Sequence, residues 1–422
     1  MKKGTLYTVG LAAAMTAGLT VTAFAGWSHD GVNWYYYHDR TGNMITDEWM
    51  KSGDYYYYLG YDGKMVTNSL IDDLYYVDAN GARVTNSWQY LYGEDEWDED
   101  EAGWRYFTTN GKMYQDGMRE IDGEWYHFDD SIMSTGWVEI DDYTYYFRES
   151  GARADGWRWL ADPDEDNWGE YWYYFGNNGK MVAGDDKVID EKTYIFDEDG
   201  RMLTGWVNPE DYTSTGNWDL SNEDTADLLF FDDNGAAAEG WHFMSAPDGS
   251  DDYWFYFKAG RAYSPEYKTT VVGEYGMAKI DSETYCFDEE GHLVTGLIQV
   301  NDGRYFFFDE DDGTMLTGRA SISNDEFDEQ EFYFATSGTT GKRGAGLTGV
   351  KDSRVYDNGL LLCAEDGMKY QIVEIWDDGE KERYLVSESG KIKTSGTVKD
   401  GNGVKYKVTK SDGKYQIEIV ND

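Results

Sequence analysis

The sequence predicts an all-β protein, an elongated solenoid of tandem β-hairpins that ends in a small C-terminal β module. Three observations predict it. An aromatic run followed by Asp-x-x-Gly recurs along most of the chain. Aromatic residues make up 17% of the composition, and 49 glycines stand against only 4 prolines. The composition then changes near residue 342, beyond which aromatic residues become sparse. Abundant rings and glycine are typical of short strands joined by tight turns.

Residues 1–25 are predicted to be a cleaved secretory signal peptide. Two lysines give a positive start, small and apolar residues follow over 6–22, and Ala-Phe-Ala at 23–25 offers a cleavage site. The alternative is a transmembrane anchor, which the short run, interrupted by glycine and threonine, disfavours. We therefore expect a mature chain that is secreted or held at a bacterial cell surface, and that is not embedded in the membrane.

The repeat consists of an aromatic strand, a tight turn and a returning strand. Residues 74–81, 193–200 and 284–291 read LYYVDANG, TYIFDEDG and TYCFDEEG. Rings suit a pleated, half-buried surface, while Asp bonds neighbouring amides and Gly adopts a positive φ. The returning strands at 64–67 and 201–204 read KMVT and RMLT. We count about thirteen such repeats, with a period near twenty residues, over 26–346.

The hairpins are expected to stack on one another, because a single two-stranded hairpin is unstable alone. Neighbours would bury their aromatic faces together, so that stability is shared along the array. Gly-Trp opens many repeats, beginning at positions 136, 156, 205 and 240. Packing between hairpins is the expected role of most tyrosines and phenylalanines, whereas the tryptophan of Gly-Trp suits packing and ligand contact equally.

Residues 347–422 are predicted to form a C-terminal β cap module. From residue 342 to the end, 14 basic residues balance 14 acidic ones, in a chain whose totals are 36 and 82. Val404, Tyr406 and Val408 alternate with lysines, and Ser-Asp-Gly at 411–413 turns the chain into a second alternating run, which is a hairpin signature. A cap is needed because an exposed last hairpin would offer a sticky edge.

The formal net charge of −46 restricts the partners. It argues against nucleic acid and anionic lipid, and it favours neutral or cationic ligands or a divalent metal. Acidic inserts at 94–101, 162–170 and 219–227 are interpreted as solvated loop tips. Calcium binding in these loops is the alternative, although none has the spacing of an EF-hand. We therefore predict no metal site and no cofactor.

Cys286 and Cys363 are the only cysteines. Secretion would permit a disulfide between them. Cys286, however, occupies a strand position that holds tyrosine or phenylalanine in sister repeats, which favours a role in buried packing. Whether the two cysteines pair stays open at this point.

The repeat resembles the cell-wall-binding repeat superfamily. The shared pattern is Gly-Trp, an aromatic triplet and Asp-x-x-Gly-x-Met-x-Thr-Gly, and it covers roughly three-quarters of the chain. That group includes choline-binding modules, glucan-binding repeats of streptococcal glucosyltransferases and receptor-binding repeats of large clostridial toxins; residues 296–318 look particularly like the toxin type. The resemblance implies a left-handed β-solenoid with ligands held between consecutive repeats.

The resemblance also implies candidate ligand sites. In the choline-binding relatives, a cage combines the Trp of Gly-Trp, a Trp of the aromatic run and a Tyr of the next repeat. Three pairs match here, namely Trp27 with Trp34, Trp157 with Trp172, and Trp241 with Trp254. Tyr57 and Tyr194 are expected to close the first two cages. Elsewhere the second position holds a residue that breaks the cage, as at Leu74, Thr144, Thr193 and Thr284.

The predicted function is non-catalytic binding of cell-wall polysaccharide, glucan or a choline-bearing polymer, with non-covalent attachment to the wall. Weak aromatic sites become effective when many act on one polymer. One alternative is an adhesin that binds host glycans or proteins. A second alternative is an accessory of a cell-wall hydrolase, but the chain has no H-E-x-x-H or G-x-S-x-G motif and its last 80 or so residues contain no histidine.

Overall fold

The computed structural model describes residues 26–92, 102–164, 168–214, 225–249, 251–324, 327–377 and 379–420. The predicted signal peptide at 1–25 and most of the predicted acidic inserts lie outside these ranges. The chain divides into two compact units, residues 1–181 and 182–422, and each is described by itself.

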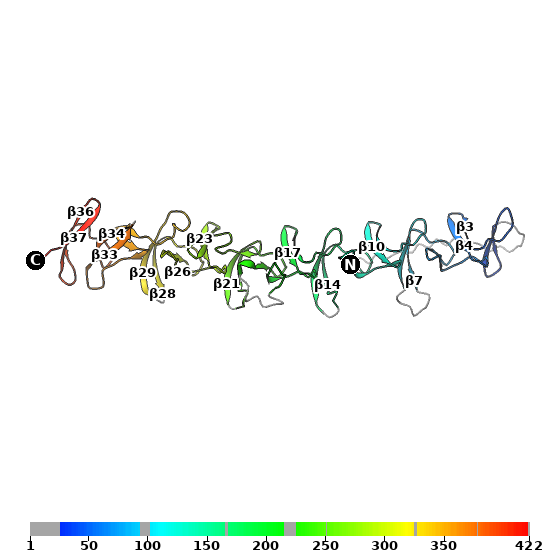
Figure 1. The fold of residues 1–422 in the computed structure, drawn as a ribbon, viewed down its shortest axis with the longest axis horizontal. Coiled ribbons are helices and arrows are strands. Elements are labelled where there is room, and N and C mark those ends of the chain that lie inside the picture. Colours follow the sequence, from blue (N-terminus) through cyan, green and yellow to red (C-terminus); the bar gives the residue numbers. More distant parts are fainter. Residues whose placement is uncertain are drawn as a thin grey trace. The chain divides into compact units, whose positions relative to one another are not determined.

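Short antiparallel hairpins follow one another in sequence order within each unit (Figure 1). The described residues contain β-strands and one 3-10 turn, η2 (Thr225–Asp227), but no α-helix. The prediction of an all-β hairpin array is therefore confirmed. In the same residues, no helix has the length and apolar character that a membrane span requires.

The described residues of the first unit form fifteen strands, most of them paired two by two. They are β1 (Gly26–His29), β2 (Trp34–Tyr37), β3 (Glu48–Ser52), β4 (Tyr55–Leu59), β5 (Ser69–Ile71), β6 (Tyr75–Val77), β7 (Ser87–Leu91), β8 (Gly103–Phe107), β9 (Gly117–Ile121), β10 (Glu124–Asp129), β11 (Ile132–Met133), β12 (Gly136–Ile140), β13 (Tyr143–Phe147), β14 (Gly156–Ala161) and β15 (Glu170–Phe175).

The second unit contains the remaining strands. They are β16 (Asp185–Ile189), β17 (Lys192–Phe196), β18 (Gly205–Val207), β19 (Leu229–Phe231), β20 (Gly240–Ser245), β21 (Asp252–Lys258), β22 (Arg261–Ala262), β23 (Thr270–Val272), β24 (Tyr275–Ile280), β25 (Glu283–Phe287), β26 (Gly296–Gln299), β27 (Tyr305–Phe308), β28 (Gly318–Asn324), β29 (Phe327–Phe334), β30 (Gly349–Lys351), β31 (Arg354–Asp357), β32 (Leu360–Leu361), β33 (Tyr370–Asp377), β34 (Glu380–Ser387), β35 (Gly396–Lys399), β36 (Lys405–Ser411) and β37 (Lys414–Ile419).

The hairpins share one register. In β12–β13, Gly136 lies opposite Phe147 and Trp137 opposite Tyr146, and β14–β15 repeats the same pairing with Gly156 opposite Phe175. Gly-Trp therefore opens the first strand, and the aromatic run forms the second. The turn is built as predicted: Gly200 has a φ of +82°, and the Asp-x-x-Gly aspartate before it accepts backbone amides.

A hydrogen bond that recurs between hairpins holds the stack together. The returning strand of one repeat donates a backbone N–H to a carbonyl in the preceding hairpin. Met65 donates to Trp34 at 2.8 Å, Met181 to Thr144 at 2.9 Å, and Leu293 to Trp254 at 2.8 Å. This bond sets the register between neighbours, because the returning residue cannot shift along the strand without losing it.

The core is distributed along each unit as small aromatic clusters between neighbouring hairpins. One cluster packs Trp137 and Tyr146 of one hairpin against Tyr173 and Phe175 of the next. The last ring of the second strand is completely buried in many repeats, as at Phe107, Phe147, Phe175, Phe257 and Phe287. Stacking therefore supplies the apolar burial that a single hairpin lacks.

Near the C-terminus, strands join into a larger sheet in the order β28-β29-β32-β31-β30. Residue 346, where the predicted cap boundary falls, lies between β29 and β30 of this sheet. The hairpin predicted from the alternation at 404–408 is present as β36–β37, with Tyr406 opposite Ile419 and Ser411 opposite Lys414.

Both cysteines are free thiols. Cys286 lies fully buried in β25, as its strand position predicts, and burial strongly raises the pKa of its thiol. Cys363 is exposed. A thiolate-directed reagent such as Ellman's reagent should therefore titrate one thiol in the native protein and both in denaturant. The Cys363→Ser variant should show no native reaction, and rapid native labelling of both thiols would contradict this burial.

Candidate functional site

Consecutive hairpins form a seam to which four positions contribute. Position one is the place of the tryptophan of Gly-Trp in the first hairpin. Position two lies in the second strand of that hairpin. Position three is a ring in the second strand of the next hairpin. Position four is the returning residue whose amide bonds to the carbonyl of position two. In the first seam these positions are Trp27, Trp34, Tyr57 and Met65.

The first seam brings the predicted rings together. The centroids of Trp27 and Trp34 lie 6.3 Å apart with their planes at 90°, and Tyr57 lies 5.0 Å from Trp27. The indole N–H of Trp27 donates to Ser52 Oγ at 3.1 Å, which holds the ring in place. Burial raises the pKa of the Tyr57 phenol, so this ring stays neutral. The result is a corner of perpendicular ring faces.

The pair Trp241 and Trp254 makes the same corner in the second unit. Their centroids lie 6.4 Å apart at 82°. Tyr285 occupies position three, 4.8 Å from Trp241, and Leu293 occupies position four. Sequence reasoning did not assign Tyr285, because the additional strands β22 and β23 separate it from the tryptophans. Tyr285 can be identified by its position two residues before Phe287, the last ring of the strand.

The pair Trp157 and Trp172 has centroids 6.3 Å apart and planes at 89°. Trp159 lies beside Trp172 at 5.5 Å and is 50% exposed. Tyr194, the predicted third ring, lies in β17 of the second unit, and its part in this cage stays a prediction.

One further double-tryptophan seam was missed by the sequence reasoning. Trp88 is at position one and packs 4.9 Å from Tyr126 at position three. Trp104 lies at position two, three residues before the buried Phe107. In the sequence, a long insert between β7 and β8 separates Trp88 from Trp104. The spacing of Trp104 from Phe107, the last ring of its strand, identifies the pair.

The seam that begins at Trp49 already contains a cation. Positions two and three are Tyr56 and Tyr75, and position four is Arg83, whose amide donates to the Tyr56 carbonyl at 2.7 Å. The Arg83 guanidinium lies 4.3 Å from the Tyr56 centroid and 5.5 Å from each of the other two rings. Its Nε is buried without a hydrogen-bond partner. Three rings at these positions therefore enclose a positive group.

Comparison with known proteins shows what these hairpins are similar to. Choline-binding repeat profiles match residues 57–83 and 275–319, and a cell wall binding repeat profile matches 119–131 and 135–152. The matched stretches have the sequence pattern of choline-binding and cell wall binding repeats. Residues 57–83 run from the third ring of the first seam to Arg83.

Curated relatives match these repeats at modest identity. Glucosyltransferase-I of Streptococcus downei is 24% identical over 423 residues, which cover 94% of this chain and 24% of that protein. Glucosyltransferase-S of Streptococcus mutans is 24% identical over 88% of this chain and 22% of its own length. The chain thus spans about a quarter of the curated relatives it matches.

Similar solved structures include two proteins of Streptococcus pneumoniae. The modular autolysin LytC is 20% identical, with a TM-score of 0.40, over 64% of this chain and 52% of that one. The choline-binding domain of CbpL is 24% identical, with a TM-score of 0.36, over 51% of this chain and 98% of that domain.

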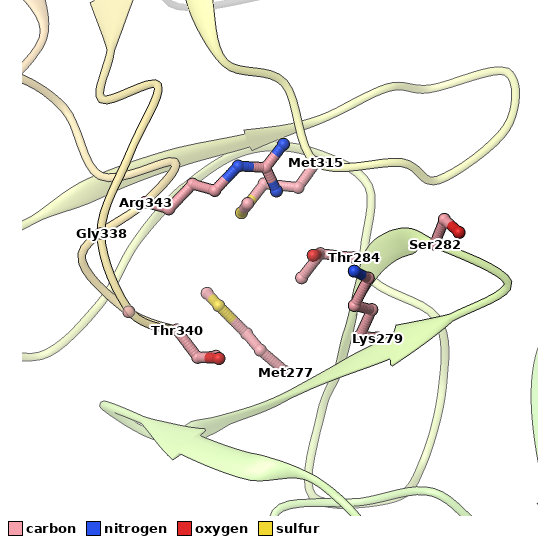
Figure 2. A pocket seen from close by; sticks show the side chains of 9 residues that line it. Met277, Lys279, Ser282, Thr284, Met315, Gly338, Thr340 and Arg343 are labelled. Atoms are coloured by element: carbon pink, nitrogen blue, oxygen red, sulfur yellow. The ribbon is translucent and has the colours of Figure 1, made fainter.

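Other described hairpins lack a second tryptophan. The strand registers and the recurring hydrogen bond place Leu74, Thr144, Thr193 and Thr284 at position two, where the predicted cage is broken. At Thr284 the missing ring leaves a cavity (Figure 2).

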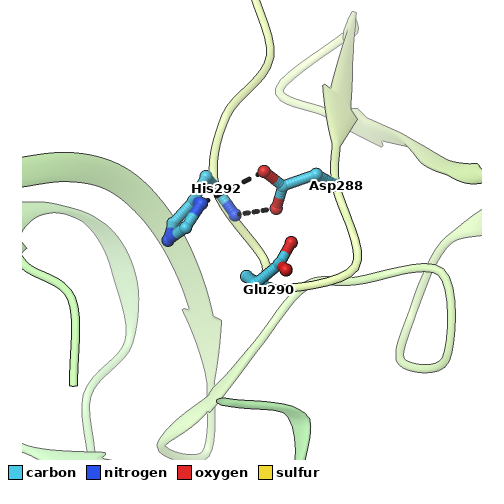
Figure 3. A group of neighbouring side chains, drawn as sticks. All are labelled: Asp288, Glu290 and His292. Atoms are coloured by element: carbon cyan, nitrogen blue, oxygen red, sulfur yellow. Dashed lines mark hydrogen bonds and ion pairs between the residues drawn. The ribbon is translucent and has the colours of Figure 1, made fainter. Parts of the chain in front are cut away.

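One group of side chains in the described residues has the spacing of metal ligands. Ligand atoms of Asp288, Glu290 and His292 lie within 4.8 Å of one another (Figure 3). Asp288, however, accepts the His292 amide at 2.8 Å and contacts its Nδ1 at 3.1 Å, and the imidazole stacks on Tyr253. These are the contacts of an Asp-x-x-Gly turn, so the group has a structural explanation. The absence of a metal or cofactor stays a prediction.

Replacing Arg83 with glutamine tests the internally filled seam. The Arg83→Gln variant should lose about 1–2 kcal/mol of unfolding free energy, because a half-buried guanidinium that contacts three rings is removed. Urea denaturation measures this loss. Arg40→Gln, in an exposed turn of the same unit, is the matched control and should change stability little. Equal stability of the two variants would show that the ring contacts contribute nothing.

Proposed function

We propose that this chain is a secreted or cell-surface, non-catalytic protein that binds a choline-bearing cell-wall polymer through aromatic cages between its hairpins. The observation that carries the proposal is the perpendicular tryptophan pair with a tyrosine from the next hairpin. This cage occurs around Trp27 and again around Trp241.

The shape of the cage favours a compact cation. A quaternary ammonium group has no N–H to donate, and ring faces on several sides are the recognised way to hold it. Two perpendicular rings with a third beside them supply such faces, whereas a sugar stacks on one flat ring. The Arg83 guanidinium within an equivalent set of rings supports this preference.

The electrostatics and the repetition also support it. A net charge of −46 raises the local concentration of cationic groups near the chain. Each cage contributes on the order of 0.5–2 kcal/mol, which is weak alone. Several cages on one chain engage a polymer that carries many choline groups, so that useful affinity arises from avidity.

A second candidate function is binding of neutral glucan. The matched relatives are named glucosyltransferases. Trp159 and Phe243 occupy equivalent places beside cages and are exposed as open, flat rings. Such rings suit the C–H face of a sugar. Cages and open rings side by side are compatible with a polymer that has both choline and saccharide units.

Retention of the secreted protein on purified bacterial walls and on a choline-substituted resin tests the proposal. We expect retention on both and release by free choline. Release by an α-glucan but not by choline would replace the proposal with the glucan candidate. Binding restricted to host glycoconjugates would indicate an adhesin, and breakdown of wall material would contradict the non-catalytic assignment.

A further inference from the structure

The second unit contains a cavity of about 300 Å³ where the hairpin β24–β25 meets the loop at 338–343 (Figure 2). Its lining differs from that of the aromatic cages. It combines two thioethers, two cations and hydroxyl groups, from Met277, Met315, Lys279, Arg343, Thr284 and Thr340.

The cavity occupies the place of a cage. Met277 holds position one, since it lies opposite Cys286 in the register that places Trp137 opposite Tyr146 elsewhere. Thr284 holds position two, and Met315 at position four donates its amide to the Thr284 carbonyl at 2.8 Å. Both tryptophans of a cage are thus replaced by smaller side chains, and the space they would fill is open.

Two cations enter this space from different elements. Lys279 lies opposite Thr284 in the hairpin. Arg343 comes from the loop, which Arg304 holds by a hydrogen bond to the Gly341 carbonyl. Figure 2 shows both charged ends reaching toward the same space, with Thr284 between them.

Neither cation forms an ion pair with another described residue. Within the ranges that the structure describes, no carboxylate lies within 4.0 Å of Lys279 or Arg343. Lys279 is exposed and Arg343 is half-buried. Acidic residues outnumber basic ones 82 to 36 in this chain, so two cations beside one cavity give it a local charge opposite to that of the chain. Glu283 is next to Thr284 in the strand, and its side chain is expected on the opposite face of the hairpin because side chains alternate along a strand.

We propose that this cavity binds an oxyanion, a phosphate or carboxylate group carried by a saccharide or a wall polymer. A guanidinium matches two oxygens of such a group at once, an ammonium adds a second charge, and the hydroxyls of Thr284 and Thr340 can donate further hydrogen bonds. Met277 and Met315 give the cavity an apolar wall beside these polar groups.

The negative charge of the whole chain does not prevent this binding. At physiological ionic strength, charges more than about 8 Å apart are largely screened, so the two lining cations dominate inside the cavity. The same cations would repel a quaternary ammonium. The inference goes beyond the proposed function and is independent of it, because the cavity contains none of the cage tryptophans.

Isothermal titration of the full secreted chain with glycerol 3-phosphate, with glucuronate and with neutral glucose tests the inference. We expect at least one charged probe to bind and glucose not to bind at this cavity. Arg343→Gln and Lys279→Gln should each weaken the binding about tenfold, and raised salt should weaken it in the parent protein. Lys187→Gln, an exposed lysine on β16, is the matched control and should bind normally.

The two charged probes distinguish the sources, since binding of one alone identifies phosphate or carboxylate as the natural group. Failure of both probes at concentrations on the order of 10 mM would overturn the inference. The double variant Lys279→Gln, Arg343→Gln provides a second test. Unchanged binding by this variant would also overturn the inference, provided that its thermal unfolding matches that of the parent. Retention of the double variant on choline resin should be unaffected, which separates this test from that of the cages.

Discussion

Replacing Trp34, Trp172 and Trp254 together with alanine is expected to reduce retention on a choline surface by at least about 30-fold. Each residue is the position-two wall of a perpendicular pair. Trp172 and Trp254 are 43% and 47% exposed, so their removal costs little packing. Each cage would lose about 1 kcal/mol, and these losses combine when several cages hold one polymer. Surface plasmon resonance on immobilised choline measures the effect.

Trp125→Ala is the matched control for this prediction. Trp125 also lies at position two and is 39% exposed, but its hairpin has Met118 in place of the first tryptophan. No perpendicular tryptophan pair is lost, so retention should stay near that of the parent. If the triple variant binds choline as tightly as the parent while retaining its far-ultraviolet circular dichroism, the cages are packing elements and the proposed function is wrong.

Replacing Trp206 with alanine is expected to destabilise the second unit by about 3–5 kcal/mol. Trp206 stands at position one like the cage tryptophans, yet it is only 2% exposed. Its ring lies 5.3 Å from both Phe230 and Phe255, and its indole N–H donates to the Ser245 carbonyl at 3.1 Å. Its removal therefore leaves a cavity between two hairpins and an unpaired carbonyl.

Urea denaturation and hydrogen exchange measure this second effect. Because each hairpin is stabilised mainly by its neighbours, protection should be lost first around β18 to β21. The control is Trp159→Ala, the same chemical change at a half-exposed ring, which should cost no more than about 0.5 kcal/mol. A comparable loss of stability in the two variants would show that burial does not separate structural from accessible tryptophans in this chain.

The hairpins could be predicted from the sequence because their determinants are local. The Asp-x-x-Gly turn and the aromatic run beside it lie within eight residues, as at 193–200, and alternation sets which rings share a face. The tryptophan pairs Trp27–Trp34 and Trp241–Trp254 were predicted for the same reason, since both members belong to one hairpin.

The rest of each site comes from another hairpin, and here the sequence alone was insufficient. Tyr285 was not assigned because two inserted strands lie between it and its tryptophans. The tryptophan at 104 was not assigned because a long insert separates it from its partner. Nothing in the local sequence distinguishes the fully buried Trp206 from a cage tryptophan, because burial depends on which rings the next hairpin presents.

By itself, the sequence determined the all-β hairpin repeat and the tryptophan pairs Trp27–Trp34, Trp157–Trp172 and Trp241–Trp254. Only the tertiary structure decided what enters each seam: an arginine at Trp49, a tyrosine at Trp241, and two cations beside Thr284. The physical reason is that a turn is specified by a few adjacent residues. A seam, by contrast, is specified by the hydrogen bond that aligns one hairpin with the next, and its contents come from residues far apart in the chain.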